Sequence, residues 1–117
     1  IISFGAGVHW ALETLEKHPE ISADLLDLRT LQPLDTEAIF TSVKKTNKVI
    51  ILQEDTLFGG VASDISAMIM EQCFEHLDAP VRRVGSLESA IPFVKALEDQ
   101  YLPKERFEKE LIELLAY

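Results

Sequence analysis

Cysteine is nearly absent from the sequence, and long apolar runs are absent altogether. The single cysteine, Cys73, excludes an internal disulfide and offers no zinc-ligand spacing, so we expect a reduced cytosolic or organellar compartment. No apolar run approaches the roughly 20 residues that cross a bilayer. We therefore expect no membrane contact and no structural metal.

Positive charge is also scarce. The 11 Lys and Arg residues against 20 Asp and Glu residues give a formal net charge of -9. Such a chain repels phosphate backbones and anionic lipid surfaces, which excludes nucleic acid and membranes as partners. A basic protein partner is compatible with this charge.

Linker-like and disordered stretches are missing as well. The 117 residues are 47% hydrophobic and contain no Ser/Gly/Pro-rich tract or long charge run, so we expect one domain over residues 1–117 with a real core. The chain opens directly on the core-strand pattern of Ile1–Phe4. We therefore expect a fragment of a longer polypeptide.

Apolar runs of strand length alternate with segments of helical periodicity, a pattern typical of an α/β domain with a mostly parallel sheet. The segment Val49–Leu52 is apolar on both faces, which predicts a central strand covered by helices on each side. Right-handed crossovers then give a three-layer α/β/α sandwich. The expected strands are residues 1–4, 22–28, 48–53 and 81–84.

Four helices are expected between these strands and after them. Asp35 is a good N-cap for the second helix, and Asn47 is a good C-cap. The expected ranges are 8–18, 35–47, 60–79 and 103–117. The residues that periodicity turns toward the core are Val8, Ala11, Leu12, Leu15, Ile39, Phe40, Val43, Val61, Ile65, Met68, Ile69, Cys73, Leu77, Phe107, Leu111, Leu114 and Leu115.

Two glycine-containing turns are candidates for phosphate binding. Gly5–Gly7 follows a strand, but Trp10 stands where a dinucleotide fingerprint needs its third glycine, and its bulk hinders the close helix-strand approach. Gly59–Gly60 precedes a helix, but no P-loop lysine follows, and Glu54 and Asp55 repel phosphate. Tight turns are the preferred interpretation. A flavodoxin-like domain that binds a small phosphorylated ligand at these turns is the alternative.

No catalytic, cofactor-binding or metal-binding residue is expected in this chain. His9, His18 and His76 are far apart in sequence and have no metal-ligand spacing, and His9, the only one near the carboxyl end of a strand, has no nearby Ser or Cys to activate. Cys73 lies on the apolar stripe of its helix, which favours a buried structural thiol.

Acidic side chains gather toward the end of the third helix and the end of the chain. These are Glu71, Glu75, Asp78, Glu108, Glu110, Glu113 and the terminal carboxylate at Tyr117. A solvated face is the default interpretation, and docking of a basic module is the alternative.

Six motifs carry a resemblance that covers nearly the whole chain. They lie in residues 3–9, 27–35 (DLRTLQPLD, the most specific), 53–55, 58–65, 77–84 and 101–103. In this order they resemble the carboxyl-terminal, transketolase-type domain of 2-oxoacid dehydrogenase beta subunits. Residues 71–74 with 77–80 are more similar to the branched-chain (2-oxoisovalerate) type than to the pyruvate type, whereas residues 85–92 depart from the family pattern.

This resemblance implies a whole oxidoreductase of branched-chain amino acid degradation. It decarboxylates a 2-oxoacid on thiamin diphosphate with Mg²⁺ and transfers the acyl group to lipoamide, in the bacterial cytoplasm or the mitochondrial matrix. The catalytic and cofactor-binding residues lie outside this sequence, so the isolated fragment is expected to be inactive. A transketolase fragment shares the fold, but it requires phosphate-binding cations that this acidic chain does not obviously supply.

The resemblance also implies partners. They are the alpha part, a second beta part in a homodimeric contact, and the basic subunit-binding domain of the lipoyl acyltransferase. Carried onto this sequence, the docking surface falls on Phe74, Asp78 and Tyr117, and we add the neighbouring Glu75.

Overall fold

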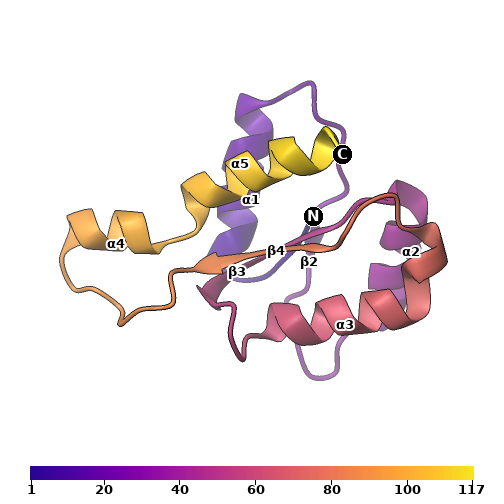
Figure 1. Cartoon of the computed structure of the whole chain (residues 1–117), viewed down its shortest axis with the longest axis horizontal. Helices are drawn as coiled ribbons and strands as arrows, with labels where there is room; N and C mark the ends of the chain where they lie inside the picture. The colour runs from indigo at the N-terminus through magenta and orange to yellow at the C-terminus, as the bar shows by residue number, and fades with distance from the viewer.

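Four parallel strands form one sheet at the centre of the computed structural model, which describes all residues from 1 to 117 (Figure 1). The strand order is β2-β1-β3-β4, so the longest strand, β3, lies in the interior of the sheet. In chain order the elements are β1 Ile2–Ser3, α1 Ala6–Lys17, β2 Leu26–Asp27, α2 Thr36–Thr46, β3 Ile50–Thr56, α3 Val61–Cys73, the 3₁₀ turn η1 Phe74–His76, β4 Arg82–Ser86, α4 Lys95–Tyr101 and α5 Lys104–Leu115.

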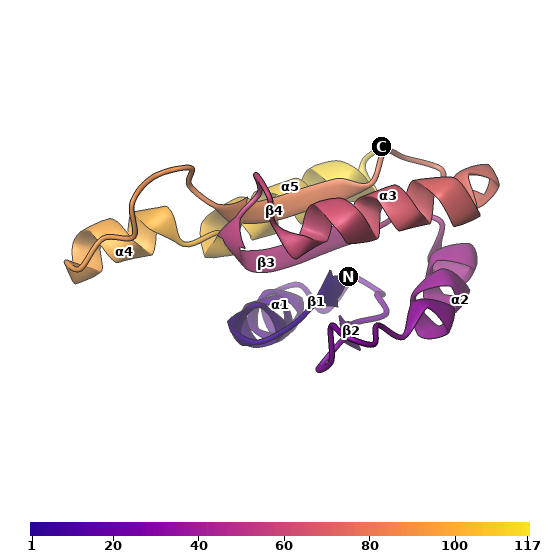
Figure 2. The ribbon, with the colours of Figure 1, turned by 90° about the horizontal axis from the view of Figure 1, so that it is seen from below.

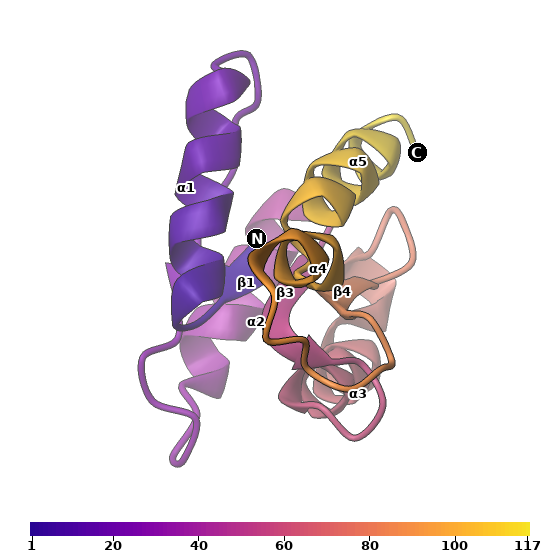
Figure 3. The same cartoon turned by 90° about the vertical axis from the view of Figure 1, so that its left-hand side faces the viewer.

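Helices cover both faces of this sheet (Figures 2 and 3). Ile51 of β3 and its neighbour Val49 pack into one core with α2 and α3. Ile50 and Leu52 face the other way, into a second core with α1 and α5. Because side chains alternate along a strand, β3 supplies both cores. The predicted three-layer α/β/α sandwich is confirmed, and all of the strand pairs are parallel.

Local signals set the boundaries of α2 as predicted. The Asp35 side chain accepts a hydrogen bond from the Ala38 N–H at 3.0 Å, which caps the start of the helix. Asn47 ends the helix in the left-handed conformation, with a φ of 62°. The same analysis predicts the start of α3 at Gly60 and the start of α5 at Pro103, and both are confirmed.

Other boundaries differ from the prediction. The second strand is only Leu26–Asp27, because its neighbour β1 is itself two residues long and offers no further pairing. The third helix stops at Cys73, and η1 replaces its last turn. Leu12 and Leu115, predicted as core residues, are exposed. None of the helices combines the length and apolar character that a bilayer crossing requires.

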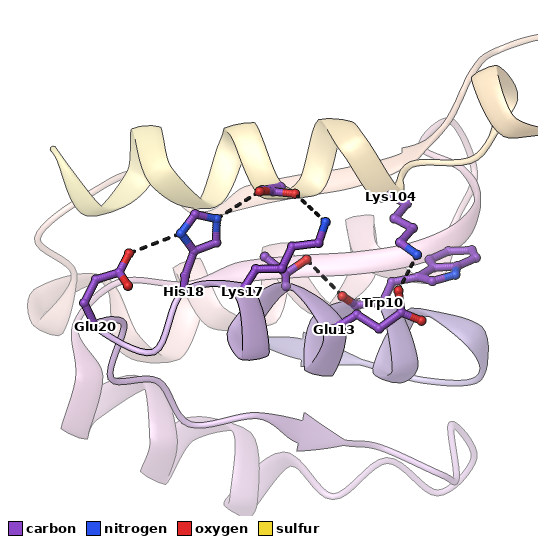
Figure 4. A network of polar contacts seen from close by, with 8 residues as sticks. Trp10, Glu13, Lys17, His18, Glu20 and Lys104 are labelled. Atoms are coloured by element: carbon purple, nitrogen blue, oxygen red, sulfur yellow. Dashed lines mark hydrogen bonds and ion pairs between the residues drawn. The ribbon is translucent and has the colours of Figure 1, made fainter.

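A polar network joins α1 to α5 (Figure 4). His18, just after α1, engages two carboxylates: Nδ1 lies 3.1 Å from Glu20 Oε1, and Nε2 lies 2.9 Å from Glu108 Oε1. Lys17 also donates to Glu108, at 3.3 Å. Only the imidazolium form donates from both ring nitrogens, so these carboxylates favour the protonated ring.

The protonation of His18 makes the stability of the chain depend on pH. Hydrogen bonds to Glu108 and then to Glu20 raise the pKa of His18 above its usual range. The folded chain therefore holds this proton more tightly than the unfolded chain, and the resulting stability is complete below about pH 6.5 and is lost as the pH rises through the folded pKa. We predict that His18→Gln destabilises the chain more at about pH 6 than at about pH 9, as measured by urea unfolding.

His9→Gln is the matched control, because His9 is exposed and its ring makes no hydrogen bond. We expect its effect on the free energy of unfolding to depend less on pH than that of His18→Gln, because His9 acts on the Glu13 carboxylate only through charge and makes no side-chain hydrogen bond. An effect of His18→Gln that is no more pH-dependent than that of His9→Gln would contradict the proposed role of the charged His18 ring.

Candidate docking site

The four residues predicted to dock a partner lie at one end of the molecule, at the amino-terminal edge of the sheet. Phe74 and Glu75 belong to η1, Asp78 to the loop after it, and Tyr117 follows α5. The C-terminus and the segment between α3 and β4 lie at the same end in Figures 1 and 2, opposite α4. Phe74 is 66% exposed and Tyr117 is 65% exposed, so both aromatic side chains are available for contact.

Two consecutive residues before β3 hold both parts of this surface. The Asn47 side chain donates to the His76 carbonyl at 2.7 Å, and the Asn47 carbonyl accepts the Asp78 N–H at 2.9 Å. Lys48 Nζ donates to the Leu115 carbonyl at 3.0 Å, near the end of α5. The loop with Asp78 and the end of α5 are therefore both positioned relative to the sheet.

The acidic side chains divide into two groups that the sequence alone does not separate. Glu75 and Asp78 are exposed, and no basic group lies within ion-pair distance of either. Three acidic residues of α5 are paired within the chain: Glu108 with Lys17 and His18, Glu110 with Arg82, and Glu113 with Lys109. Uncompensated negative charge near this end is thus concentrated around η1 rather than along α5.

Each of the two glycine turns contains one glycine that close packing requires. A Cβ at Gly7 would overlap the Ser3 side chain, so this glycine allows α1 to approach β1 closely. A Cβ at Gly60 would overlap the Gln53 side chain. The buried Gln53 carboxamide accepts the Ala62 N–H at 2.7 Å, which occupies a helix end that an anion would need. Gly7 and Gly60 therefore serve close packing, in agreement with the tight turns expected at these two positions.

The chain's own ionisable residues do not assemble a cofactor site. No group of three or more His, Cys, Asp or Glu side chains is arranged to hold a metal ion. His9 and His76 are exposed, and His18 is engaged with two glutamates. Cys73 is buried in a core, which confirms the predicted burial of this thiol. The residues present therefore do not fit a magnesium diphosphate group.

A second exposed surface lies at the opposite, carboxyl-terminal edge of the sheet. We call residues 87–97, between β4 and the first half of α4, the apolar arm. Figure 2 shows α4 projecting beyond the sheet. The exposed apolar side chains of the arm are Leu87, Ile91, Phe93, Val94 and Leu97. Residues 87–97 have no helical or strand periodicity in the sequence, so the arm is not predicted, and the departure from the family pattern at residues 85–92 is the signal that the sequence carries there.

One side chain fixes the base of the apolar arm. Arg106 of α5 donates to the carbonyls of Gly85 at 3.0 Å, Tyr101 at 2.9 Å and Gln100 at 3.1 Å. The Leu87 N–H donates to the Tyr101 carbonyl at 3.1 Å. These bonds join the end of β4 to the end of α4.

Comparison with known proteins identifies the family. The family model described as "Transketolase, C-terminal domain" matches residues 1–106, so the chain belongs to the transketolase C-terminal domain family. A solved structure, "Split gene transketolase, inactive beta4 tetramer", has a TM-score of 0.79 and 24% sequence identity, and the match covers 98% of this chain and 37% of that one. This likeness supports the fold.

Among curated proteins, similar relatives are beta subunits. The acetoin:2,6-dichlorophenolindophenol oxidoreductase subunit beta of Bacillus subtilis is 43% identical over 105 residues, covering 88% of this chain and 31% of the relative. The pyruvate dehydrogenase E1 component subunit beta of Rickettsia felis is 36% identical over 119 residues, covering 100% and 36%. The 2-oxoisovalerate dehydrogenase subunit beta of Bacillus subtilis is 39% identical over 105 residues, covering 87% and 32%. The chain spans about a third of the length of these relatives.

The role of Asn47 is testable with two substitutions. Asn47→Ala places an ordinary side chain at a φ of 62° and removes the bond to the His76 carbonyl, so we predict a loss of about 2 kcal/mol. Asn47→Gly keeps the left-handed conformation accessible and removes only the side-chain bond, so its loss should be about half as large. Denaturant unfolding measures both. Equal losses would show that the backbone conformation is not part of the effect.

Proposed function

We propose that the chain is an assembly and docking domain in the beta part of a thiamin-diphosphate-dependent 2-oxoacid dehydrogenase. The family match over residues 1–106 and the beta-subunit relatives support this proposal. The whole enzyme oxidatively decarboxylates a 2-oxoacid and transfers the acyl group to lipoamide, in the bacterial cytoplasm or the mitochondrial matrix. Other parts of the enzyme hold thiamin diphosphate and Mg²⁺, and this chain supplies contacts to the alpha part and to a second beta part.

The observation that supports the docking role is that exposed aromatic rings and carboxylates without ion pairs occur at the same end of the molecule. Phe74 and Tyr117 are well exposed, and Glu75 and Asp78 lack internal cations. Aromatic anchors supply much of the affinity of protein interfaces, and charges at the rim steer association. This combination suits the basic subunit-binding domain of a lipoyl acyltransferase.

The docking prediction concerns calorimetric titration of the chain with that subunit-binding domain. We expect salt-sensitive binding at one partner per two chains, because we propose that the docking surface lies beside the contact between two beta parts. Glu75→Gln with Asp78→Asn should weaken binding about fivefold at low salt and flatten its salt dependence. Phe74→Ala should weaken it by about 2 kcal/mol at any salt concentration.

The double variant Glu16→Gln/Glu105→Gln is the charge-matched control. Both residues are exposed and neither makes an ion pair or hydrogen bond, so the control removes the same charge elsewhere. Binding by the Glu75→Gln/Asp78→Asn variant that equals binding by the control would argue against the electrostatic docking role.

The choice of a branched-chain 2-oxoacid is the finer part of the proposal. Residues 71–74 and 77–80 support it, as does the 39% identity to the 2-oxoisovalerate dehydrogenase subunit, although the pyruvate and acetoin relatives are comparably similar. In the whole dehydrogenase that contains this chain, we expect kcat/KM for 2-oxoisovalerate to exceed that for pyruvate by about tenfold or more. A higher value for pyruvate would reject the branched-chain assignment and leave the docking proposal intact.

A further inference from the structure

A crevice of about 310 Å³ opens at the carboxyl-terminal edge of the sheet, away from the docking residues. Phe4 follows β1, and Glu54 and Asp55 lie in the second half of β3, so the crevice sits between the ends of these two strands. The chain passes from β1 to β2 on one side and enters β3 on the other, which makes this the switch point of the sheet. Open α/β sheets bind ligands at such points. The remaining lining residues are Ile91, Glu98, Tyr101 and Leu102.

Tyr101 is the first sign that the crevice takes a partner. It is only 6% exposed, and its carbonyl is fixed by the Leu87 N–H and by Arg106. Its phenolic hydroxyl nevertheless has no hydrogen-bond partner within the chain, and the only fully inaccessible side-chain polar atom without one is Arg82 Nε. The hydroxyl is therefore accessible, on a buried residue that lines the crevice. Buried tyrosine hydroxyls usually find a partner.

The charge of the crevice is the second sign. Glu54, Asp55 and Glu98 line it, and none of them takes part in an ion pair. The nearby cations are engaged elsewhere: Lys95 lies 3.3 Å from Asp99, and the Arg106 guanidinium donates to three backbone carbonyls. The crevice therefore combines an apolar wall with the uncompensated Glu54 and Glu98 side chains, which is complementary to a cation with an alkyl stem.

The apolar arm indicates that this cation belongs to a protein segment. Ile91 lines the crevice and is exposed, and Phe93, Val94 and Leu97 extend the apolar surface along the arm. Several exposed large apolar side chains within one short segment indicate a contact with another molecule. A free amine or metal ion would fill the crevice and leave this surface in water.

We propose that the crevice receives an arginine side chain from an apolar segment of a partner protein. The guanidinium lies among the Glu54 and Glu98 carboxylates and the Tyr101 hydroxyl, and its alkyl stem lies against Phe4 and Leu102. Arginine is preferred to lysine because its planar group presents five donors, enough for several acceptors at once. This site is separate from the proposed acyltransferase surface and does not depend on that assignment.

The test is a titration of the ¹⁵N-labelled chain with two capped tripeptides, acetyl-Leu-Arg-Leu-amide and acetyl-Leu-citrulline-Leu-amide, followed by NMR. Citrulline has nearly the shape of arginine and no charge. We expect the arginine peptide to shift the amide signals of Phe4, Asp55 and Tyr101, and to bind about tenfold more tightly than the citrulline peptide. Glu54→Gln/Glu98→Gln should weaken the arginine peptide about tenfold and Tyr101→Phe about threefold.

The Glu16→Gln/Glu105→Gln control should bind the arginine peptide like the original chain, and the spectra report directly whether each variant is folded. Equal affinity for the two peptides, no binding of either, or shifts confined to the segment around Phe74 would each overturn the proposal. None of these results affects the test of acyltransferase docking, which concerns the other end of the molecule.

Discussion

Burial of β3 on both faces is the constraint on which the rest of the structure depends. Residues from Val49 to Gln53 are all buried, and their side chains alternate between two cores. Every helical layer is positioned against this strand, and its two ends carry the two surfaces of interest. Asn47 and Lys48 precede it at the docking end, and Glu54 and Asp55 lie at its other end, in the crevice.

The sequence predicts the architecture well because its strongest signals are periodic. The apolar run at Val49–Leu52 identifies the central strand, and Asp35 and Asn47 identify the ends of α2. Elements without such signals are missed. Helix α4 is the clearest case. Its Leu97 is exposed and only Tyr101 is buried, so the sequence of this helix has no apolar stripe that would predict it. The early end of α3 is missed because the Asn47 bond to His76 is a long-range contact.

The candidate surfaces are predicted less completely than the fold. The family resemblance indicates Phe74, Asp78 and Tyr117, but only three-dimensional pairing distinguishes free carboxylates from those of α5 that Lys17, Arg82 and Lys109 neutralise. The glycine turns show the same limit. The bulk of Trp10 predicts that α1 stays away from the sheet, whereas Gly7 lets that helix approach β1 closely. The packing role of Gly60 depends on the Gln53 side chain, which lies seven residues earlier in the sequence.

The adjacency of Asn47 and Lys48 has a mechanical consequence. In the proposed docking role, a partner bound at η1 or at the end of α5 would pull on segments that are hydrogen-bonded to these two residues, just before β3. Because β3 is hydrogen-bonded to strands on both sides, this tension is shared across the sheet and does not fall on one helix alone. Under the docking proposal, force applied at the docking surface is therefore transmitted to the most deeply buried strand of the sheet.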